Sequence, residues 1–158
     1  MGLNRIYEKC TEPKETNRQI GPLFKRWINR GSLGVLPVDE QVFLSSNDNA
    51  ILAGSDEEMK EFAKQYLNYQ GEKGLNFVAR FNGKYIVGEA KFLTDFGGHQ
   101  NAQFNDAMKL LDTPINAITI TILDGVLYIP SGRRVSMNIN SGKNIMSALV
   151  LRDFLYQV

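Results

Sequence analysis

The sequence predicts an α/β domain: a central mixed β-sheet flanked by helices, in the order helix-strand-strand-helix-strand-strand-helix. Three observations lead to this prediction. Apolar residues recur at helical spacing in several segments, two apolar runs flank an Asn-Gly pair, and a β-branched run stands later in the chain. Helical and extended patterns alternate along the sequence, which is typical of helices packed on a sheet.

The first helix is expected to start at Thr16, where Thr16-Asn17-Arg18-Gln19 has the spacing of a capping box. Apolar residues then follow at helical intervals: Leu23, Phe24, Trp27 and Ile28. Farther on, Val42-Phe43-Leu44 is interpreted as a short strand, and the segment from Ala50 to Ala53 fits either a helix or a strand.

A second helix is expected to begin with the capping box Ser55-Asp56-Glu57-Glu58. The acidic residues of its first turn would interact favourably with the positive end of the helix dipole. Its apolar positions lie three and four residues apart: Met59, Phe62, Ala63, Tyr66 and Leu67. The helix is expected to end near Gly71, since glycine is common just past a helix C-terminus.

Asn82-Gly83 is the strongest hairpin signal in the sequence, because both residues tolerate positive φ. A two-residue loop would pair Phe81 with Lys84, and a constant register would then place Asn76 opposite Glu89. Alternation would put one set of side chains on one face of the hairpin: Asn76, Val78, Arg80, Tyr85, Val87, Glu89 and Lys91. The strand ends would therefore bring an amide, a carboxylate and an ammonium together.

Beyond the hairpin, a helix is expected from Gln100 to Leu111, with Phe104, Met108 and Leu111 facing inward. The β-branched run from Ile118 to Ile122 predicts a strand, and Asp124-Gly125 is expected to turn into a second hairpin strand over 126–129. A last helix is expected from Asn144 to Tyr156.

The 158 residues are enough for one domain over 1–158, with a core in 55–156 and an N-terminal extension, 1–50, of unassigned role. The 18 basic and 17 acidic residues nearly cancel, so no global field indicates nucleic acid. Cys10 is the single cysteine, which excludes an internal disulfide. No apolar run approaches the ~20 residues of a membrane span, and a cytoplasmic protein with no membrane partner is expected.

The residues at the hairpin ends have the chemistry of a metal-dependent phosphodiesterase. Mg²⁺ prefers carboxylate and carbonyl oxygens, and it lowers the pKa of a bound water. Glu89, position 76 and the backbone carbonyl of Ala90 are the candidate metal ligands. Lys91 is the candidate group for orienting the attacking water or for offsetting phosphate charge.

Gly88-Glu89-Ala90-Lys91, on the second strand of a hairpin that follows a helix, resembles the PD-(D/E)XK nuclease superfamily. The run from Gly88 to Phe104 and the run from Asn144 to Leu149 are similar to type II restriction endonucleases. The resemblance implies a restriction-endonuclease-like core and Mg²⁺-dependent cleavage of double-stranded DNA that leaves 5′-phosphates. The chain is short for a complete sequence-specific enzyme, so a homodimer, a partner recognition subunit or an excised catalytic domain is expected.

By the same resemblance, Glu89 and Lys91 are the acid-x-lysine pair, and a helix glutamate, Glu58 or Glu61, completes the site. The chain departs from the family at Asn76, where an aspartate is expected. We hypothesise that this chain is an inactivated variant with Asn at that position. The alternatives are a junction-resolving or repair nuclease, a non-catalytic DNA-binding module on the same fold, and an α/β domain in which Glu89 and Lys91 form only an ion pair.

An amide-rich stretch follows the second hairpin strand. Asn and Gln pair bidentately with adenine, and basic side chains contact phosphates without specifying sequence. The expected DNA-binding residues are His99, Gln100, Asn101, Gln103, Arg133, Arg134 and Lys143. Because His99 is the single histidine, a zinc site there is not expected.

Overall fold

The computed structural model describes residues 16–94, 98–125 and 143–158. Six strands form one mixed sheet in the order β1-β2-β3-β4-β5-β6. Strands β2, β3 and β4 pair antiparallel, and the pairs β1–β2, β4–β5 and β5–β6 are parallel. The strands are β1 (Pro37–Val38), β2 (Ala50–Leu52), β3 (Phe77–Phe81), β4 (Lys84–Leu93), β5 (Ile118–Gly125) and β6 (Ile145–Met146).

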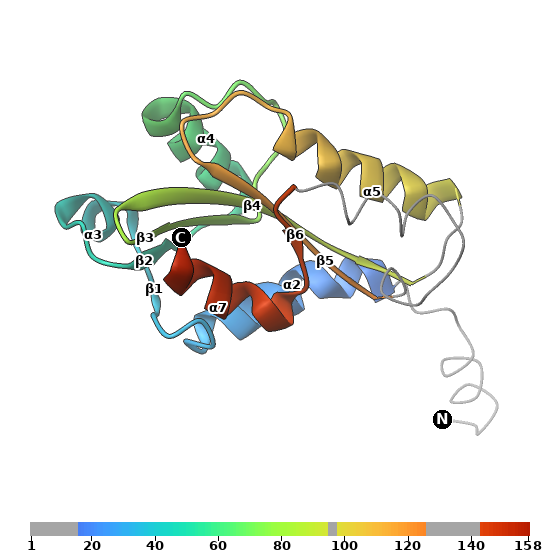
Figure 1. Cartoon of the computed structure of the whole chain (residues 1–158), viewed down its shortest axis with the longest axis horizontal. Helices are drawn as coiled ribbons and strands as arrows, with labels where there is room; N and C mark the ends of the chain where they lie inside the picture. The colour runs from blue at the N-terminus through green and yellow to red at the C-terminus, as the bar shows by residue number, and fades with distance from the viewer. Residues whose placement is uncertain (1–15, 95–97, 126–142) are drawn as a thin grey trace, which may run out of the picture.

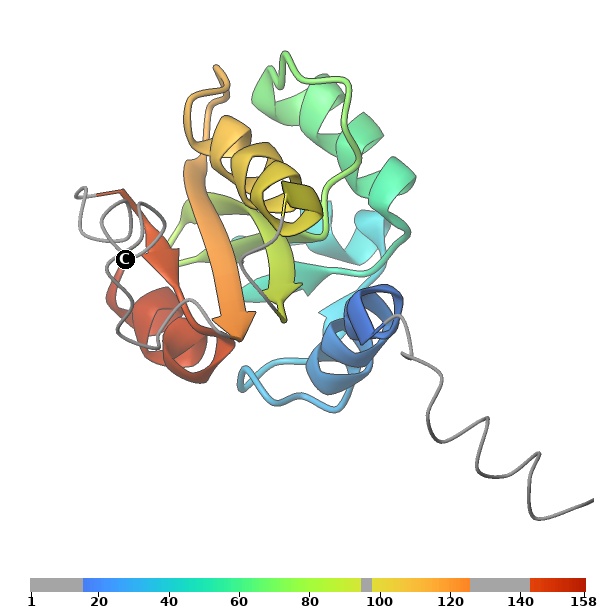
Figure 2. The same ribbon diagram turned by 90° about the vertical axis from the view of Figure 1, so that its right-hand side faces the viewer.

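Helices cover both faces of this sheet (Figures 1 and 2). Helices α2 (Thr16–Asn29) and α7 (Ala148–Gln157) pack on one face, while α4 (Asp56–Leu67) and α5 (Gly98–Leu111) lie on the other, with the short α3 (Glu40–Ser45) beside α4. Each face has its own buried apolar cluster, because alternate strand residues point to opposite sides. The predicted α/β class with a central mixed sheet is confirmed.

The predicted hairpin is confirmed over β3 and β4. Asn82 and Gly83 have φ of 51° and 74°, as a tight two-residue turn requires. The five pairs run from Phe81↔Lys84 to Phe77↔Gly88, which is the predicted register. Val78 and Val87 pack toward α4, whereas Ala79 and Ile86 pack toward α2 and α7.

Strand β4 lies inside the sheet, and this position buries the functional end of the hairpin. Its other edge pairs in parallel with β5, where Glu89 stands opposite Thr121 and Lys91 opposite Leu123. Helix α5 makes the crossover between these two strands and packs Phe104 and Ala107 against them. Glu89 is therefore paired with β5 alone, one residue beyond the last pair of β4 with β3 at Gly88.

Two predictions in the first half of the chain are wrong. The segment Val42-Phe43-Leu44 belongs to α3, because Asp39 caps a helix start by accepting a hydrogen bond from the Val42 N–H at 2.9 Å. Helix α4 ends at Leu67 rather than near Gly71, since Asn68 adopts the left-handed conformation (φ 55°) that ends a helix. The ambiguous segment at Ala50 is strand β2.

The C-terminal predictions also need correction. The segment expected to be helical from Asn144 contains strand β6, and α7 starts at Ala148 after the Ser147 N-cap. The Asp124-Gly125 turn is wrong, because both residues continue β5 and pair with β4; residues 126–129 lie outside the described part. In α5, Phe104 is buried and Met108 packs, partly buried, against the same cluster, as expected. Ala107 and Leu110 are buried as well, whereas Leu111 is only partly buried.

Among the described residues, no helix has the length and apolar character needed to cross a membrane.

Candidate active site

Asn76 lies at the point where the β3–β4 ladder ends. The last ladder pair is Phe77↔Gly88, and the Asn76 N–H also donates to the Gly88 carbonyl at 3.3 Å. Two consecutive residues of one strand thus oppose one residue of the other, which is the arrangement of a β-bulge. The Asn76 amide is bonded at both ends: Oδ1 accepts from the Ala90 N–H at 2.9 Å, and Nδ2 donates to Asp56 Oδ2 at 2.9 Å.

The bulge changes the face on which this side chain lies. Asn76 lines a cavity together with Asp56 and with Lys25 of α2, whereas Glu89 lines a different cavity, on the side of α5. The predicted direct pairing of Asn76 with Glu89 is therefore not formed, and the constant two-residue alternation fails at this position. Position 76 still contacts the backbone of the Glu-x-Lys segment through Ala90.

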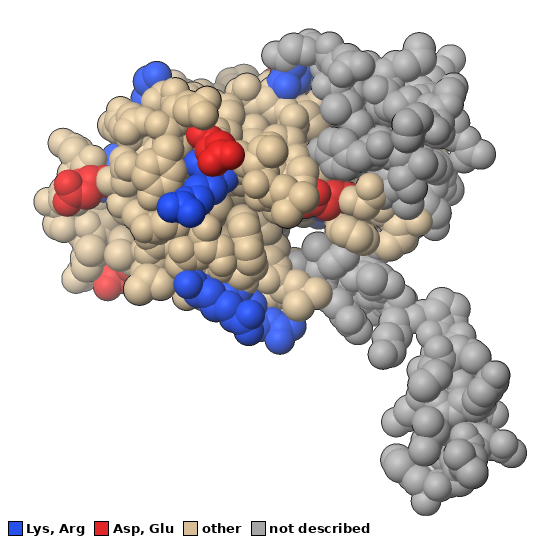
Figure 3. All heavy atoms as spheres, turned by 60° about the horizontal axis from the view of Figure 1, so that its bottom comes forward, with Lys and Arg blue, Asp and Glu red and all other residues tan. Residues whose placement is uncertain are grey.

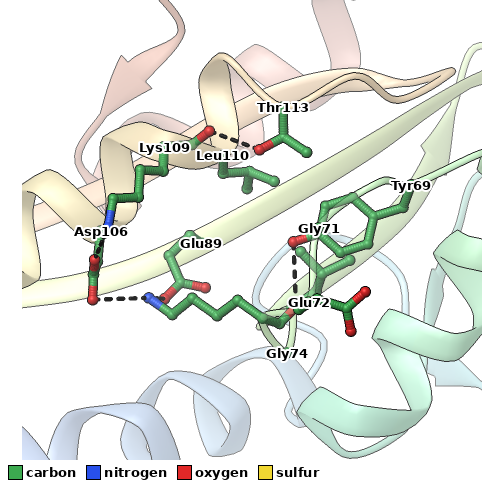
Figure 4. Close-up of a pocket in the computed structure, with 11 residues that line it drawn as sticks. Tyr69, Gly71, Glu72, Gly74, Glu89, Asp106, Lys109, Leu110 and Thr113 are labelled. Atoms are coloured by element: carbon green, nitrogen blue, oxygen red, sulfur yellow. Dashed lines mark hydrogen bonds and ion pairs between the residues drawn. The ribbon is translucent and has the colours of Figure 1, made fainter.

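Glu89 is a carboxylate at the bottom of a cavity of about 170 Å³ (Figure 4). Only 2 % of the residue is exposed, and Oε1 lies 2.8 Å from Lys91 Nζ and 3.1 Å from Lys73 Nζ. A buried carboxylate is costly unless cations compensate it, and these two ammonium groups do so. Glu89 and Lys91 are thus brought together as predicted.

Two further charged side chains, which the sequence pattern does not identify, lie beside the Glu89 carboxylate. Lys73, from the loop before β3, reaches toward α5, where its Nζ lies 3.9 Å from Asp106 Oδ2. Asp106 Oδ1 is paired with Lys109 Nζ at 2.9 Å. The Lys109 ammonium and then that of Lys73 hold the pKa of Asp106 below its usual value.

The helix acid next to position 76 is Asp56, not Glu58 or Glu61. Glu58 completes the capping box, in which its Oε2 accepts from the Ser55 N–H at 2.7 Å. This hydrogen bond holds the pKa of Glu58 below its usual value. Glu61 is exposed and its carboxylate lies 3.7 Å from Lys60. The capping box itself was the missed signal, since it fixes Asp56 as the first residue of α4, directly beside the end of β3.

The donor atoms around position 76 fit a hard cation in part. The described residues hold no group of three His, Cys, Asp or Glu side chains placed for a metal ion. Within the same part of the chain, however, two buried carboxylate oxygens make no hydrogen bond: Asp56 Oδ1, which is ion-paired with Lys25 at 2.7 Å, and Glu89 Oε1. They lie on either side of Asn76, and oxygen donors of this kind suit Mg²⁺.

The predicted DNA-binding residues are described only in part, and their role stays a prediction. Asn101 is exposed and Gln103 half-buried on α5, while Lys143 is engaged by both oxygens of Asp112 at 2.8 and 3.0 Å. His99 and Gln100 lie in the first turn of α5, and Arg133 and Arg134 lie outside the described residues. On the face seen in Figure 3, Lys and Arg stand in separate groups and not in one continuous basic surface.

Comparison with known proteins gives one match. A family model described as Tsp45I type II restriction enzyme matches residues 1–158. No curated protein and no solved structure matches the chain. The family match confirms the resemblance to type II restriction endonucleases, and the mixed sheet flanked by helices is compatible with their fold.

Proposed function

The chain belongs to the Tsp45I family of type II restriction enzymes, and from this premise we propose that it is built as a Mg²⁺-dependent endonuclease of PD-(D/E)XK type. Double-stranded DNA is the substrate, and the site lies at the end of the β3–β4 hairpin. The observation that supports this assignment is the buried Glu89 carboxylate, ion-paired with Lys91 beside position 76.

Position 76, Asp56 and the Ala90 carbonyl are the groups that would hold Mg²⁺ at the hairpin end. Glu89, whose carboxylate lies in the separate cavity beside α5, would join them only by turning toward position 76. The ion would supply positive charge at the phosphoryl oxygens and lower the pKa of a water. Lys91, whose Nζ lies 2.8 Å from Glu89 Oε1, would place its ammonium at the attacking water or at a phosphate oxygen. The pairing of this part of β4 with β5 fixes the backbone of both residues, so their spacing does not have to form when DNA binds.

Position 76 decides whether this site is active. An aspartate there could still accept from the Ala90 N–H, but it could not donate to Asp56, which Asn76 contacts at 2.9 Å. Two carboxylates at that distance repel unless a cation lies between them. We therefore infer that an aspartate at position 76 would require Mg²⁺ between its carboxylate and that of Asp56. Asn76 donates a hydrogen bond to Asp56 in place of that ion, and this leaves the chain inactive.

The test is Asn76→Asp. The reverted protein should cut plasmid DNA with Mg²⁺ and not with EDTA, and it should be less heat-stable than the Asn76 protein until Mg²⁺ is added, because the new carboxylate pair repels. Asn76→Asp with Glu89→Gln is the matched control and should not cut. If Asn76→Asp cuts no DNA, the nuclease proposal fails.

One observation favours a second candidate, a non-catalytic DNA-binding module. The Asn76 amide is bonded at both ends, which suits a native asparagine. This candidate predicts DNA binding without cleavage even after Asn76→Asp.

Including a four-way junction in the same digest separates a restriction enzyme from a junction-resolving nuclease, which would cut the junction and spare linear DNA.

The oligomeric state belongs to the same proposal. A homodimer would present two sites that cut both strands of a duplex together, whereas a partner recognition subunit would supply contacts to the DNA sequence. Sedimentation of Asn76→Asp with and without duplex DNA would show which arrangement forms.

A further inference from the structure

The cavity that Asn76 shares with Lys25 and Asp56 has a volume of about 620 Å³, which is in the range of ligand sites, roughly 300–1,000 Å³. One part of its wall comes from α2 and another from the first turn of α4, and Ala90 of β4 lines it as well. Position 76 and the Ala90 carbonyl are groups to which the proposed function assigns the metal. A DNA phosphate that reaches the metal would therefore lie in this cavity.

Helix α2 gives the cavity a basic wall. The charged residues of Thr16–Asn29 are Arg18, Lys25 and Arg26, and none of them is acidic. Lys25 lines the cavity and is partly buried, whereas Arg26 is exposed. Charges of a single sign along a helix favour a polyanion as the partner, and the restriction-enzyme family implies DNA as the substrate. Lys25 is thus the basic residue of α2 that is placed to meet a phosphate in the cavity.

The Lys25 ammonium contacts the start of α4. Its Nζ lies 2.7 Å from Asp56 Oδ1, and it donates to the Gly54 carbonyl at 3.3 Å. The Lys25 side chain is 35 % exposed and that of Asp56 is 48 % exposed, so water reaches both partners. An ion pair with this exposure is weak, because solvent screens it. Each partner can therefore exchange the other for a more strongly charged one, a phosphate for Lys25 or a cation for Asp56.

We propose that Lys25 is a phosphate-binding residue of this cavity, and that Asp56 holds its ammonium away from the DNA until the Asp56 charge is itself neutralised. That neutralisation by a metal rests on the proposed function. The phosphate contact does not, because it depends only on the positions of Lys25 and Asp56 and on DNA as the substrate. The alternative is a purely structural role, in which Lys25 only joins α2 to the start of α4.

The experiment measures binding of fluorescent duplexes to the full chain by anisotropy, with Asn76 unchanged and EDTA present. Asp56→Asn removes the competing charge and keeps an oxygen that can accept from Asn76. In this background Lys25→Met should weaken binding about tenfold on duplexes of any sequence, and it should lower the salt slope by about one phosphate contact. With Asp56 in place, Lys25→Met should weaken binding by no more than about twofold. Lys25→Arg combined with Asp56→Asn keeps the charge and should bind as Asp56→Asn alone does.

The ion pair of Lys64 and Glu72, at 2.9 Å, is the matched control. Neither residue is among the described ones that line this cavity, so Lys64→Met should have the same effect on binding with and without Glu72→Gln. If Lys25→Met weakens binding equally with Asp56 and with Asp56→Asn, only net charge matters and the proposal is overturned. The absence of any loss, or of any DNA binding, overturns it as well.

Circular dichroism and thermal unfolding establish that each variant is folded, and Lys25→Gln is a second neutral variant for use if Lys25→Met does not fold. A purely structural Lys25 would change the unfolding temperature and leave the salt slope as it is. The measurement requires neither metal nor cleavage. It can therefore succeed where Asn76→Asp cuts no DNA, and it can fail while Asn76→Asp cuts.

Discussion

Arg80 illustrates how single residues hold the hairpin in place. The residue is 2 % exposed, and its guanidinium donates to the carbonyls of Phe43 at 2.7 Å and Asp48 at 3.1 Å. The same group lies 4.7 Å from the centroid of the Phe43 ring and 6.0 Å from that of Tyr85. Arg80 thus ties the middle of β3 to α3 and to the loop that follows it.

We predict that Arg80→Met destabilises the fold by about 3 kcal/mol, because two backbone carbonyls lose charged donors in a buried place. Chemical denaturation measures the difference. Arg30→Met is the control: Arg30 is exposed at the end of α2, and the change should stay within about 0.5 kcal/mol. A loss below about 1 kcal/mol for Arg80→Met would mean that water replaces the lost donors.

At the same scale, the sequence predicted one half of the candidate site and missed the other. Glu89 and Lys91 lie two positions apart on one strand, so their proximity follows from local geometry alone. Asp56, Lys73 and Asp106 reach the site from α4, a loop and α5, and nothing in the linear pattern brings them there. The bulge at Asn76 also has no signal in a strict period of two.

Among the elements, α4 shows how an exact local motif fixes the site. The Ser55 hydroxyl accepts from the Glu58 N–H at 3.2 Å, and the Glu58 carboxylate accepts from the Ser55 N–H at 2.7 Å. This reciprocal cap sets the first turn of the helix, and Asp56 in that turn accepts from Asn76. The first turn of α4 is thereby joined to Asn76, the residue before β3.

We predict that the capping box makes stability depend on pH in the acid range. The Ser55 hydrogen bonds place the folded pKa of Glu58 below its ordinary value of 4.5. The stabilisation is therefore complete above that value and is lost as the pH falls through the folded pKa. Glu58→Gln keeps an acceptor and does not titrate, so the advantage of the unchanged chain over this variant should shrink below pH 4.5.

Thermal unfolding of both proteins from pH 7 to pH 3 measures this advantage. Glu58→Ala removes acceptor and charge together, so it should be less stable than Glu58→Gln at every pH in the series. If the unchanged chain is more stable than Glu58→Gln by the same amount at pH 3 and at pH 7, the Glu58 carboxylate is not the source of that difference.

The sequence predicted the long elements better than the short ones. The capping box of α4 and the Asn-Gly turn of the hairpin act within one element, and both are confirmed. Four of the five predicted apolar positions of α4 are buried, and Tyr66 is exposed. Strand β6 has two residues and exists because β5 offers a free edge. Helix α3 replaces the strand expected at Val42-Phe43-Leu44, because Asp39 caps the helix and Phe43 is buried against α4. Tertiary contacts decide such short segments, and local propensity does not.

Over the whole molecule, basic and acidic side chains nearly balance, and this balance bears on the metal and DNA binding that we propose. The chain has 18 basic and 17 acidic residues, with a net charge of +1. Three carboxylates, Asp56, Glu89 and Asp106, lie around the hairpin end, which is where the proposed function would bring a phosphate. Their lysine partners neutralise them but are then not free for phosphate. A divalent cation that takes the carboxylates would release these lysines toward the DNA.

We therefore predict that DNA binding by Asn76→Asp depends more on divalent metal than on ionic strength alone. Ca²⁺, used in place of Mg²⁺ to allow binding without turnover, should tighten the complex with a fluorescent duplex about tenfold over EDTA, as measured by anisotropy. NaCl at the same ionic strength should weaken the complex, because it only screens the phosphate contacts. The unchanged Asn76 chain should respond less to Ca²⁺, since it has one carboxylate fewer at position 76. Equal affinity of Asn76→Asp in Ca²⁺ and in EDTA would show that DNA binds away from the hairpin end.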